Sequence, residues 1–408
     1  MCARPDVRLQ LVSADGNHNK FYEMHDNGDN YTFTTRWGRE GSAGQTKTDN
    51  YIWDWDKIYY SKINKGYDDI TANKTKTTVQ YASISDAEID KLLKSFLECS
   101  RQYVSQFTST DMISQRAADE AQRYINLMAK HIDVSTDLNL FNSYLIELFK
   151  IIPRKMKKVE EALCHDLDKR HDFVVQEQSL LDNLINMTQV APSGDDSDKK
   201  TIEESFTFTL SQCSPEEIDF IKNKLKSDGF YRYKFNKAWK INTPARELGF
   251  QEYLENNNLK DTDKNVKMYW HGTGTENVLS ILSNGLLIKP SNSSYSGSMF
   301  GLGIYTAPNA DKASGYTSIA GSYWKGGSSR VAYMFISAVI TGKPFKVKDN
   351  YETYGGIRIC NLDGDKFSSA NLGCHSVYAK AGTSLKRDEC IVYNQNQVAC
   401  RYLVEFVV

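Results

Sequence analysis

A histidine followed by a glycine could take part in ligand binding or catalysis. The stretch from Met268 to Thr273 reads as a strand that delivers His271 and then Gly272, a residue whose backbone a ligand can approach closely. A lone histidine at the end of a strand is more often a structural residue than a ligand contact. Its meaning therefore depends on the residues that accompany it.

Three further islands of small, aromatic and acidic residues follow this histidine. Residues 301–305 read Gly-Leu-Gly-Ile-Tyr, residues 314–316 read Ser-Gly-Tyr, and residues 389–393 read Glu-Cys-Ile-Val-Tyr. Residues 277–286 predict a short helix that a glycine ends. Each island also has an ordinary interpretation, as turn glycines, core aromatic rings or a solvated glutamate. Four islands in this order are hard to obtain by chance.

Together the four islands resemble the signature of the poly(ADP-ribose) polymerase family. The resemblance is most specific from about residue 265 to the C-terminus, and it implies an ADP-ribosyltransferase that uses NAD+ as co-substrate and needs no metal. The catalytic residues it implies are His271, Tyr305 and Glu389. The cofactor-binding residues it implies are His271, Gly272, Thr273, Tyr305, Ser314 and Tyr316.

The same resemblance assigns a part of NAD+ to several of these residues. His271 would bond a hydroxyl of the adenosine ribose, while the backbone of Gly272 and the hydroxyl of Ser314 would bind the carboxamide. Tyr316 would stack on the nicotinamide ring and Tyr305 would pack on the other side, since aromatic rings offer broad, rigid contact area. The family often has a lysine directly before this serine, whereas this chain has Ala313 there and Lys312 one place earlier.

Glu389 is the residue on which the expected chemistry depends. Positive charge develops on the sugar when the bond between nicotinamide and ribose breaks, as in glycoside hydrolysis, and a nearby carboxylate stabilises that charge. By resemblance, Glu389 would bond the 2′-hydroxyl of the nicotinamide ribose and help to activate the attacking group. An incoming ribose hydroxyl is a poor nucleophile until it is polarised. The carboxylate therefore favours polymer formation over single transfer.

The N-terminal residues predict a small β-rich module with one helix. Strand-like segments between residues 7 and 50 alternate with turn signals, and residues 51–65 carry apolar side chains at helical spacing up to Gly66. The Trp-Gly-Arg core at residues 37–39 resembles the WGR domain of the family, which implies binding to DNA strand breaks. Trp37 could stack on a base while Arg36 and Arg39 contact phosphate, although a core tryptophan and a surface ion pair are an open alternative.

The middle of the chain predicts a helical bundle. Ser85 and Glu88 have the spacing of a capping box, and apolar stripes recur through residues 89–107, 112–132 and 138–152. This region resembles the family's helical regulatory domain, which would cover the NAD+ cleft until DNA binds. Residues 191–200 have almost no apolar surface to bury and predict a linker. After it, residues 206–210 have a strand pattern, and Ser214 begins a helix that ends near Gly229.

The predicted fold class is therefore α+β and multidomain: a small β-rich WGR-like domain, an all-α bundle and a mixed β-sheet ADP-ribosyltransferase domain. The predicted boundaries are residues 1–78 for the WGR-like nucleic-acid-binding domain, 83–190 for the helical regulatory domain, 191–200 for the linker and 201–408 for the catalytic domain. A length of 408 residues agrees with several domains.

Composition narrows the other possibilities. The formal net charge of -1 gives no bulk field that would draw the chain onto nucleic acid, so a DNA contact must be local. The 8 cysteines form no Cys-x-x-Cys pair, which favours free thiols over zinc sites. Neither a signal peptide nor a membrane span is expected. An intracellular protein follows, nuclear if the host is eukaryotic.

The predicted function is DNA-break-stimulated transfer of ADP-ribose from NAD+ to protein side chains, including its own, with elongation to poly(ADP-ribose). Two alternatives stay open at this point. One is a mono-ADP-ribosyltransferase, which the length of the product would distinguish. The other is a catalytically silent scaffold that binds DNA ends, and the presence of His271, Tyr305 and Glu389 counts against it.

Overall fold

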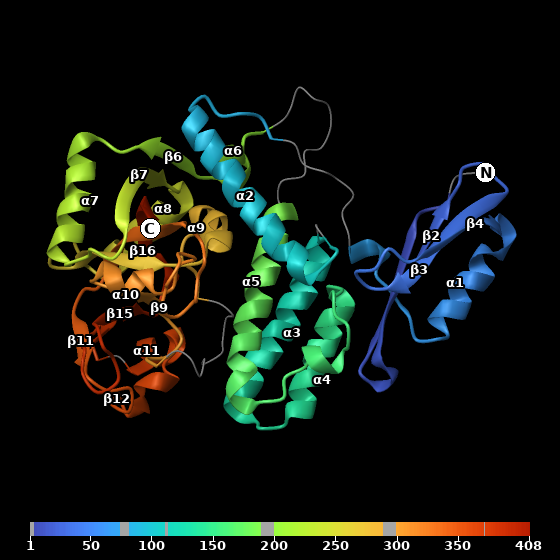
Figure 1. Cartoon of the computed structure of the whole chain (residues 1–408). Helices are drawn as coiled ribbons and strands as arrows, with labels where there is room; N and C mark the ends of the chain where they lie inside the picture. The colour runs from blue at the N-terminus through green and yellow to red at the C-terminus, as the bar shows by residue number, and fades with distance from the viewer. Residues whose placement is uncertain (1–3, 74–80, 111–112, 189–199, 289–298, 371) are drawn as a thin grey trace. The chain divides into compact units, whose positions relative to one another are not determined.

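The computed structural model describes residues 4–73, 81–110, 113–188, 200–288, 299–370 and 372–408. The chain divides into two compact units, each of which is discontinuous in sequence. One unit contains Met1–Thr78 and Arg101–Thr188, and the other contains Val79–Ser100 and Gln189–Val408. Helix α2 (Ala87–Phe107) contributes its first residues to the second unit and its last residues to the first. Figure 1 shows the elements of both units.

The first unit begins with a five-stranded antiparallel sheet in the order β4-β3-β2-β1-β5. Side chains two apart along β2 share one face, so Tyr22 and Met24 both pack into a small core with Leu9 and Phe33. Helix α1 (Trp55–Ile63) closes this core with Trp55. The strands are β1 (Val7–Ser13), β2 (His18–Asp26), β3 (Thr32–Arg39), β4 (Gln45–Tyr51) and β5 (Asp68–Asp69).

The rest of the first unit is helical. Helices α3 (Gln115–Val134), α4 (Leu138–Ile151) and α5 (Arg170–Thr188) lie side by side, with the last residues of α2 in the same unit (Figure 1). Ser114 caps α3 by accepting a hydrogen bond from the backbone of Ala117, and Asp137 caps α4 in the same way. The apolar stripes of the sequence thus form helices where they were predicted.

The second unit contains two sheets that meet at one point. The first is antiparallel throughout, and the second combines one parallel pair with two antiparallel pairs. Two backbone hydrogen bonds of 2.8 Å between Trp270 and Ala307 join them. The first sheet runs β6 (Thr209–Gln212), β7 (Lys234–Asn242), β16 (Val398–Val407), β10 (Val331–Ile340), β8 (Val266–Gly272), and the second runs β11 (Pro344–Val347), β14 (Ser376–Ala379), β15 (Glu389–Val392), β9 (Ile304–Thr306).

Short helices surround these sheets. Ser214 and Glu217 form a capping box that begins α7, and Gly285 at φ 68° ends α9, both as predicted. A two-stranded ribbon, β12 (Thr353–Tyr354) with β13 (Ile357–Arg358), completes the unit. The helices are α6 (Ile202–Phe206), α7 (Pro215–Ser227), α8 (Pro244–Asn256), α9 (Val278–Asn284), α10 (Ala310–Ser314) and α11 (Gly364–Ala370).

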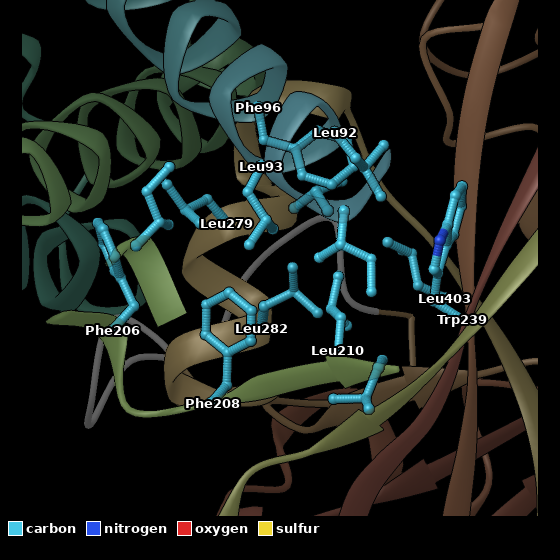
Figure 2. Close-up of a cluster of buried hydrophobic side chains, with 14 of the residues drawn as sticks. Leu92, Leu93, Phe96, Phe206, Phe208, Leu210, Trp239, Leu279, Leu282 and Leu403 are labelled. Carbon is cyan, nitrogen blue, oxygen red and sulfur yellow. The ribbon is translucent and has the colours of Figure 1, made fainter. Parts of the chain in front are cut away.

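The first turns of α2 belong to the core of the second unit. Figure 2 shows Leu92, Leu93 and Phe96 of α2 facing Leu279 and Leu282 of α9, with side chains of the β6-β7-β16 part of the sheet beneath them. Leu93 and Phe96 are fully buried, and truncating one such side chain to alanine costs about 2–5 kcal/mol. The hydroxyl of Ser100 donates to the carbonyl of Glu276 at 3.0 Å, which extends this contact toward the end of β8.

The structure is α+β, with a β-rich N-terminal part, a helical region and a sheet-based C-terminal part. Two local predictions were wrong. Asp86, not Ser85, caps α2, because its carboxylate accepts the N–H groups of Glu88 and Ile89 at 2.9 and 3.1 Å. The strand predicted over residues 206–210 begins only at Thr209, because Phe206 is the last residue of helix α6, which Thr201 and Glu204 begin with a capping box. Predicted linker residues 191–199 lie outside the described residues.

Candidate active site

His271 stands at the end of β8, beside the junction of the two sheets. Its Nδ1 lies 3.0 Å from the carbonyl oxygen of Tyr305, and only a protonated nitrogen can bond a carbonyl, so the proton is assigned to Nδ1. Burial lowers the pKa of His271, and the carbonyl of Tyr305 opposes this only partly. The ring is therefore neutral near pH 7. Its Nε2 is an acceptor suited to a hydroxyl donor.

Gly272 occupies a place that no larger residue could fill. A Cβ built on it would lie 1.8 Å from the carbonyl oxygen of Ala313, at the end of α10. This close approach brings the end of β8 against α10, so that two of the four sequence islands meet here. Thr273 follows, and its hydroxyl accepts a hydrogen bond of 3.4 Å from the side chain of Asn277.

Ser314 is turned toward its own helix. Only 2 % of the residue is exposed, and its hydroxyl donates to the carbonyl of Asp311 at 2.9 Å. Ala313, one place earlier, is the residue whose carbonyl abuts Gly272. If the family's Lys-Ser pair is matched through Lys312 instead of Ser314, Ala313 takes the place of the serine. The carboxamide-binding role of Ser314 stays a prediction.

The two tyrosines that are predicted to bind the cofactor differ in how many hydrogen bonds hold them. Tyr305 lies on β9, where its hydroxyl donates to the carbonyl of Gly301 at 2.7 Å and accepts the N–H of Phe300 at 3.0 Å. Tyr316 follows α10 and leaves 40 % of its surface exposed. Partial burial and the nearby charge of Glu389 raise the pKa of Tyr316 to about 12, so its phenol is neutral. Its partly exposed ring is stacked on Trp324, with centroids 6.0 Å apart.

Glu389 begins β15 and is almost fully buried. Only 7 % of the residue is exposed, and the ammonium of Lys312 lies 2.9 Å from its Oε1. Burial raises the pKa of Glu389, while the charge of Lys312 and its hydrogen bond lower it again. The sequence did not assign a role to Lys312. The available signal was its position, one place before the residue that the family often has as lysine.

These side chains form one continuous neighbourhood. His271 bonds Tyr305 on β9, and β9 pairs with β15 so that Tyr305 lies opposite Ile391, two residues beyond Glu389. Glu389 pairs with Lys312 of α10, and the carbonyl of Ala313 in the same helix packs against Gly272. The arrangement thus brings a neutral hydroxyl acceptor, two aromatic rings and a buried carboxylate together. This set can hold a polar dinucleotide and stabilise positive charge at its sugar.

The predicted DNA-binding residues lie on β3 in the first unit. The ring of Trp37 is stacked on Tyr22 with centroids 6.1 Å apart. Arg36 donates to Glu23 at 2.7 Å and to the carbonyl of Ala43 at 3.0 Å. Arg39 donates to the carbonyls of Met156 and Asn17 at 3.0 and 3.1 Å. Strand β3 brings the three residues together, and all three already have partners within the unit.

Over the described ranges, no group of three or more His, Cys, Asp or Glu residues could hold a metal ion. Every cysteine within those ranges is a free thiol. No helix in the described parts of the chain combines the length and apolar character that a membrane crossing needs.

Comparison with known proteins places these features in a family. The family model for the poly(ADP-ribose) polymerase catalytic domain matches residues 216–408, and that for the WGR domain matches residues 5–74. The protein mono-ADP-ribosyltransferase PARP3 of Mus musculus is 23% identical over 98% of this chain and 87% of its own length.

Two further relatives match smaller parts. Poly [ADP-ribose] polymerase 2 of Zea mays is 22% identical over 76% of this chain, which spans 54% of the maize protein. Putative poly [ADP-ribose] polymerase-like 100L of Invertebrate iridescent virus 6 is 29% identical over 48% of this chain and 96% of its own length. The chain therefore has a WGR domain and a poly(ADP-ribose) polymerase catalytic domain, and the catalytic domain supports ADP-ribosyltransferase activity with NAD+ as substrate.

Proposed function

We propose that this protein transfers ADP-ribose from NAD+ to protein side chains, its own included, and extends the attached units into poly(ADP-ribose). The observation that supports this most is the buried Glu389 carboxylate, 2.9 Å from the ammonium of Lys312 and next to the exposed ring of Tyr316. A buried carboxylate with one cationic neighbour is held ready to face positive charge without reorganisation. Tyr305 and His271 then orient the substrate.

The proposed reaction follows from these groups. NAD+ binds with an adenosine-ribose hydroxyl donating to Nε2 of His271, its carboxamide near the backbone of Gly272 and Ser314, and its nicotinamide ring on Tyr316. Thr273 and Tyr305 contact the remainder. The bond between the anomeric carbon and nicotinamide breaks, and its electron pair leaves with the neutral nicotinamide. An acceptor oxygen bonds the anomeric carbon, and its proton passes to Glu389.

The chemistry of the donor site fits NAD+ on two counts. The first is Nε2 of His271, which accepts from none of the described residues. The second is Gly272, where the Ala313 carbonyl leaves no room for a side chain, so the end of β8 carries backbone groups alone at this position. His271 thus offers a ring nitrogen acceptor to a polar ligand, and Gly272 offers its backbone groups. No metal enters the proposed reaction, since the protein groups already supply a base and a stabilising charge.

We also propose that DNA breaks stimulate this activity through the WGR domain, with Trp37, Arg36 and Arg39 as its contact residues. The domains would be residues 1–78, a helical regulatory domain at 83–190, a linker at 191–200 and the catalytic domain at 201–408. Arg39 of β3 and Asn19 of β2 donate to the backbone of Met156 and Arg154, so a DNA contact at β3 could shift the segment between α4 and α5 and, through it, these two helices. A DNA-bound role implies a nuclear protein if the host is eukaryotic.

One experiment separates this proposal from its rivals. The full chain is incubated with labelled NAD+, with and without nicked DNA, and the label on protein is resolved by length. Long products that increase with DNA support the whole proposal. Single units only would favour the mono-ADP-ribosyltransferase, a function that the name of the Mus musculus relative carries. DNA binding without any label would favour the silent scaffold.

A further inference from the structure

A cavity of about 510 Å³ lies in the second unit, and none of the residues predicted to bind NAD+ lines it. Its walls come from helix α8, from helix α11 and from the turn at Gln395–Gln397 that follows β15. The volume falls in the range of sites that hold a ligand or a side-chain anchor, about 300–1,000 Å³. We call this cavity the α8–α11 pocket, after the two helices that line it.

The framework of the pocket is buried and bonded. Phe367 and Tyr393 are 7 and 4 % exposed, and their rings are stacked with centroids 4.6 Å apart. Gln397 is also buried, and its amide donates to the carbonyls of Ile340 and His375 at 2.9 and 2.7 Å. The pocket is therefore held in shape by the protein itself, and a ligand would lose little affinity to ordering it.

The charges that line the pocket are all negative. Glu252 of α8 and Asp365 of α11 are exposed carboxylates, and the lining contains neither lysine nor arginine. Within the described parts of the chain, neither carboxylate pairs with a cation; Lys366, next to Asp365 in the sequence, pairs with Asp363 at 2.8 Å instead. Helix α8 ends at Asn256, so the negative end of its dipole also faces this region. The pocket therefore attracts a cation.

Side-chain amides supply much of the remaining polar lining. Asn256 and Asn257 lie at the end of α8, and Asn394 and Asn396 belong to the turn after β15. The side-chain nitrogens of Asn256, Asn394 and Asn396 donate to none of the other described residues, whereas that of Asn257 donates to the carbonyl of Tyr253 at 2.8 Å. An amide both donates and accepts, which matches the N–H and carbonyl groups of a peptide backbone.

These features favour one class of ligand. A nucleic acid would bring its phosphates to two carboxylates, with no cation in the lining to bind them. A sugar would find no flat face on Phe367 or Tyr393, because these rings are buried and stacked on each other. A basic peptide uses both features of the pocket, since its ammonium or guanidinium group bonds the carboxylates and its backbone bonds the amides.

We propose that the α8–α11 pocket is a docking site for a basic segment of the acceptor protein, in which the side chain of an arginine or lysine bonds Glu252 and Asp365. The inference rests on the proposed function, because it names the class of protein on which the transferase acts. It adds to that function a selection of acceptors by residues other than the one that is modified.

Strand β15 connects the pocket to the candidate active site. Glu389 begins this strand, and Tyr393 follows its last residue. At about 3.3 Å per residue, the Cα atoms of Glu389 and Tyr393 lie about 13 Å apart. An extended peptide spans this distance with about four residues. A segment of about 12 residues is therefore long enough to fill the pocket and present another side chain to Glu389, even along a longer path over the surface.

Binding is measured first, without catalysis. The full chain is titrated into a fluorescent peptide of about 12 residues, rich in lysine and arginine and with a serine and a glutamate, and anisotropy is read. The double variant Glu252→Gln, Asp365→Asn should bind this peptide about tenfold more weakly, because hydrogen bonds between charged groups are the strong ones. A neutral peptide, with glutamine at each cationic position, should bind weakly to both proteins.

The matched control is the double variant Glu255→Gln, Asp219→Asn. It removes the same two charges from exposed positions on α8 and α7 that do not line the pocket, and it should bind the basic peptide as the wild type does. The second measurement uses the same peptide as acceptor with labelled NAD+. The pocket variant should raise the KM for the peptide about tenfold, while kcat and the KM for NAD+ stay within about twofold.

Each other result has a distinct meaning. Equal binding of the basic peptide by the wild type and the pocket variant overturns the inference. Equal losses for the basic and the neutral peptide overturn it too, because the pocket would then recognise backbone alone. A fall in kcat with an unchanged KM for the peptide would place the carboxylates in the reaction and not in docking. Charge-dependent binding without label on peptide or protein would contradict the proposed function and confirm only the docking site.

Discussion

The β3 segment of the WGR domain and the catalytic site differ in where their polar groups are bonded. On β3, the guanidinium of Arg39 donates three hydrogen bonds to Asn17 and Met156, and Arg36 donates to Glu23 and Ala43. At the candidate active site, Lys312 is the one partner of the Glu389 carboxylate among the described residues. The arginines on β3 therefore stabilise the first unit, whereas the Glu389 carboxylate can still accept further hydrogen bonds.

This difference indicates how each region can work. An arginine that binds backbone carbonyls transmits a displacement, because moving it strains three bonds at once. A buried carboxylate with unused acceptor capacity instead stabilises charge and takes a proton. Asn19 supports the first role: it is fully buried on β2, and its amide donates to the carbonyl of Arg154 at 2.8 Å.

The largest effect is expected from Glu389→Gln. The amide keeps the shape of the side chain but neither takes a proton nor balances positive charge on the sugar, so transfer should fall about 10²–10⁴-fold. The measurement is kcat for nicotinamide release and polymer formation from labelled NAD+. Glu255→Gln, an exposed change on α8, is the matched control. Polymer formation at the wild-type rate would show that Glu389 is not the catalytic carboxylate.

A smaller loss is expected from His271→Ala. The variant removes the Nε2 acceptor, and one hydrogen bond that leaves a substrate hydroxyl unpaired costs about 1–3 kcal/mol. We therefore expect the KM for NAD+ to rise about tenfold or more, with a lesser change in kcat. His165→Ala, an exposed change in the first unit, is the control. If kcat alone fell and KM stayed constant, the ring would act on the reaction and not on binding.

Arg39→Ala tests the structural half of the comparison. The variant removes three hydrogen bonds from a charged donor, and such bonds contribute about 1.5–3 kcal/mol each in favourable cases. Unfolding of the first unit in urea should therefore show a loss of at least about 2 kcal/mol. Arg4→Ala, whose exposed ion pair with Asp56 contributes little, is the control. Unchanged stability with lost DNA binding would contradict the structural role and leave the proposed DNA contact as the function of Arg39.

Much of the fold was predictable because local signals agree with the tertiary structure. The capping box at Ser214 and the glycine at 285 delimit helices α7 and α9 in the sequence as in the structure. These helix ends depend on residues that are close in the sequence, so sequence patterns report them well. The pairing of β9 with β15 and the junction at Trp270 join segments that are far apart in the sequence, and only the family resemblance had placed the four islands in one predicted site.

The unpredicted features depend on partners that a pattern does not display. Arg39 binds the carbonyl of Met156, and every residue has a carbonyl, so no side chain in the sequence marks the contact. The ion pair of Lys312 with Glu389 depends on how α10 faces β15, which sequence spacing does not encode. Helix α6 was missed because Thr201 and Glu204 cap it at the edge of a segment with a strand-like pattern.

The last prediction concerns pH and the Lys312 ion pair. Burial raises the pKa of Glu389 above its ordinary value, and Lys312 lowers it again. Transfer requires the carboxylate, so the rate should fall as pH decreases through this raised pKa, at a higher pH than an ordinary glutamate would give. Lys312→Met removes the opposing effect, which raises the pKa further. The acid limb of the kcat profile should therefore move to higher pH.

Lys325→Met is the control for this shift, because Lys325 pairs with Glu276 and not with Glu389. It removes the same charge from the same surface and should leave the acid limb in place. Equal shifts in both variants would mean that the surface potential as a whole sets the titration. A shift of the limb to lower pH in Lys312→Met would assign it to another group, because removing a neighbouring cation can only favour the protonated carboxyl.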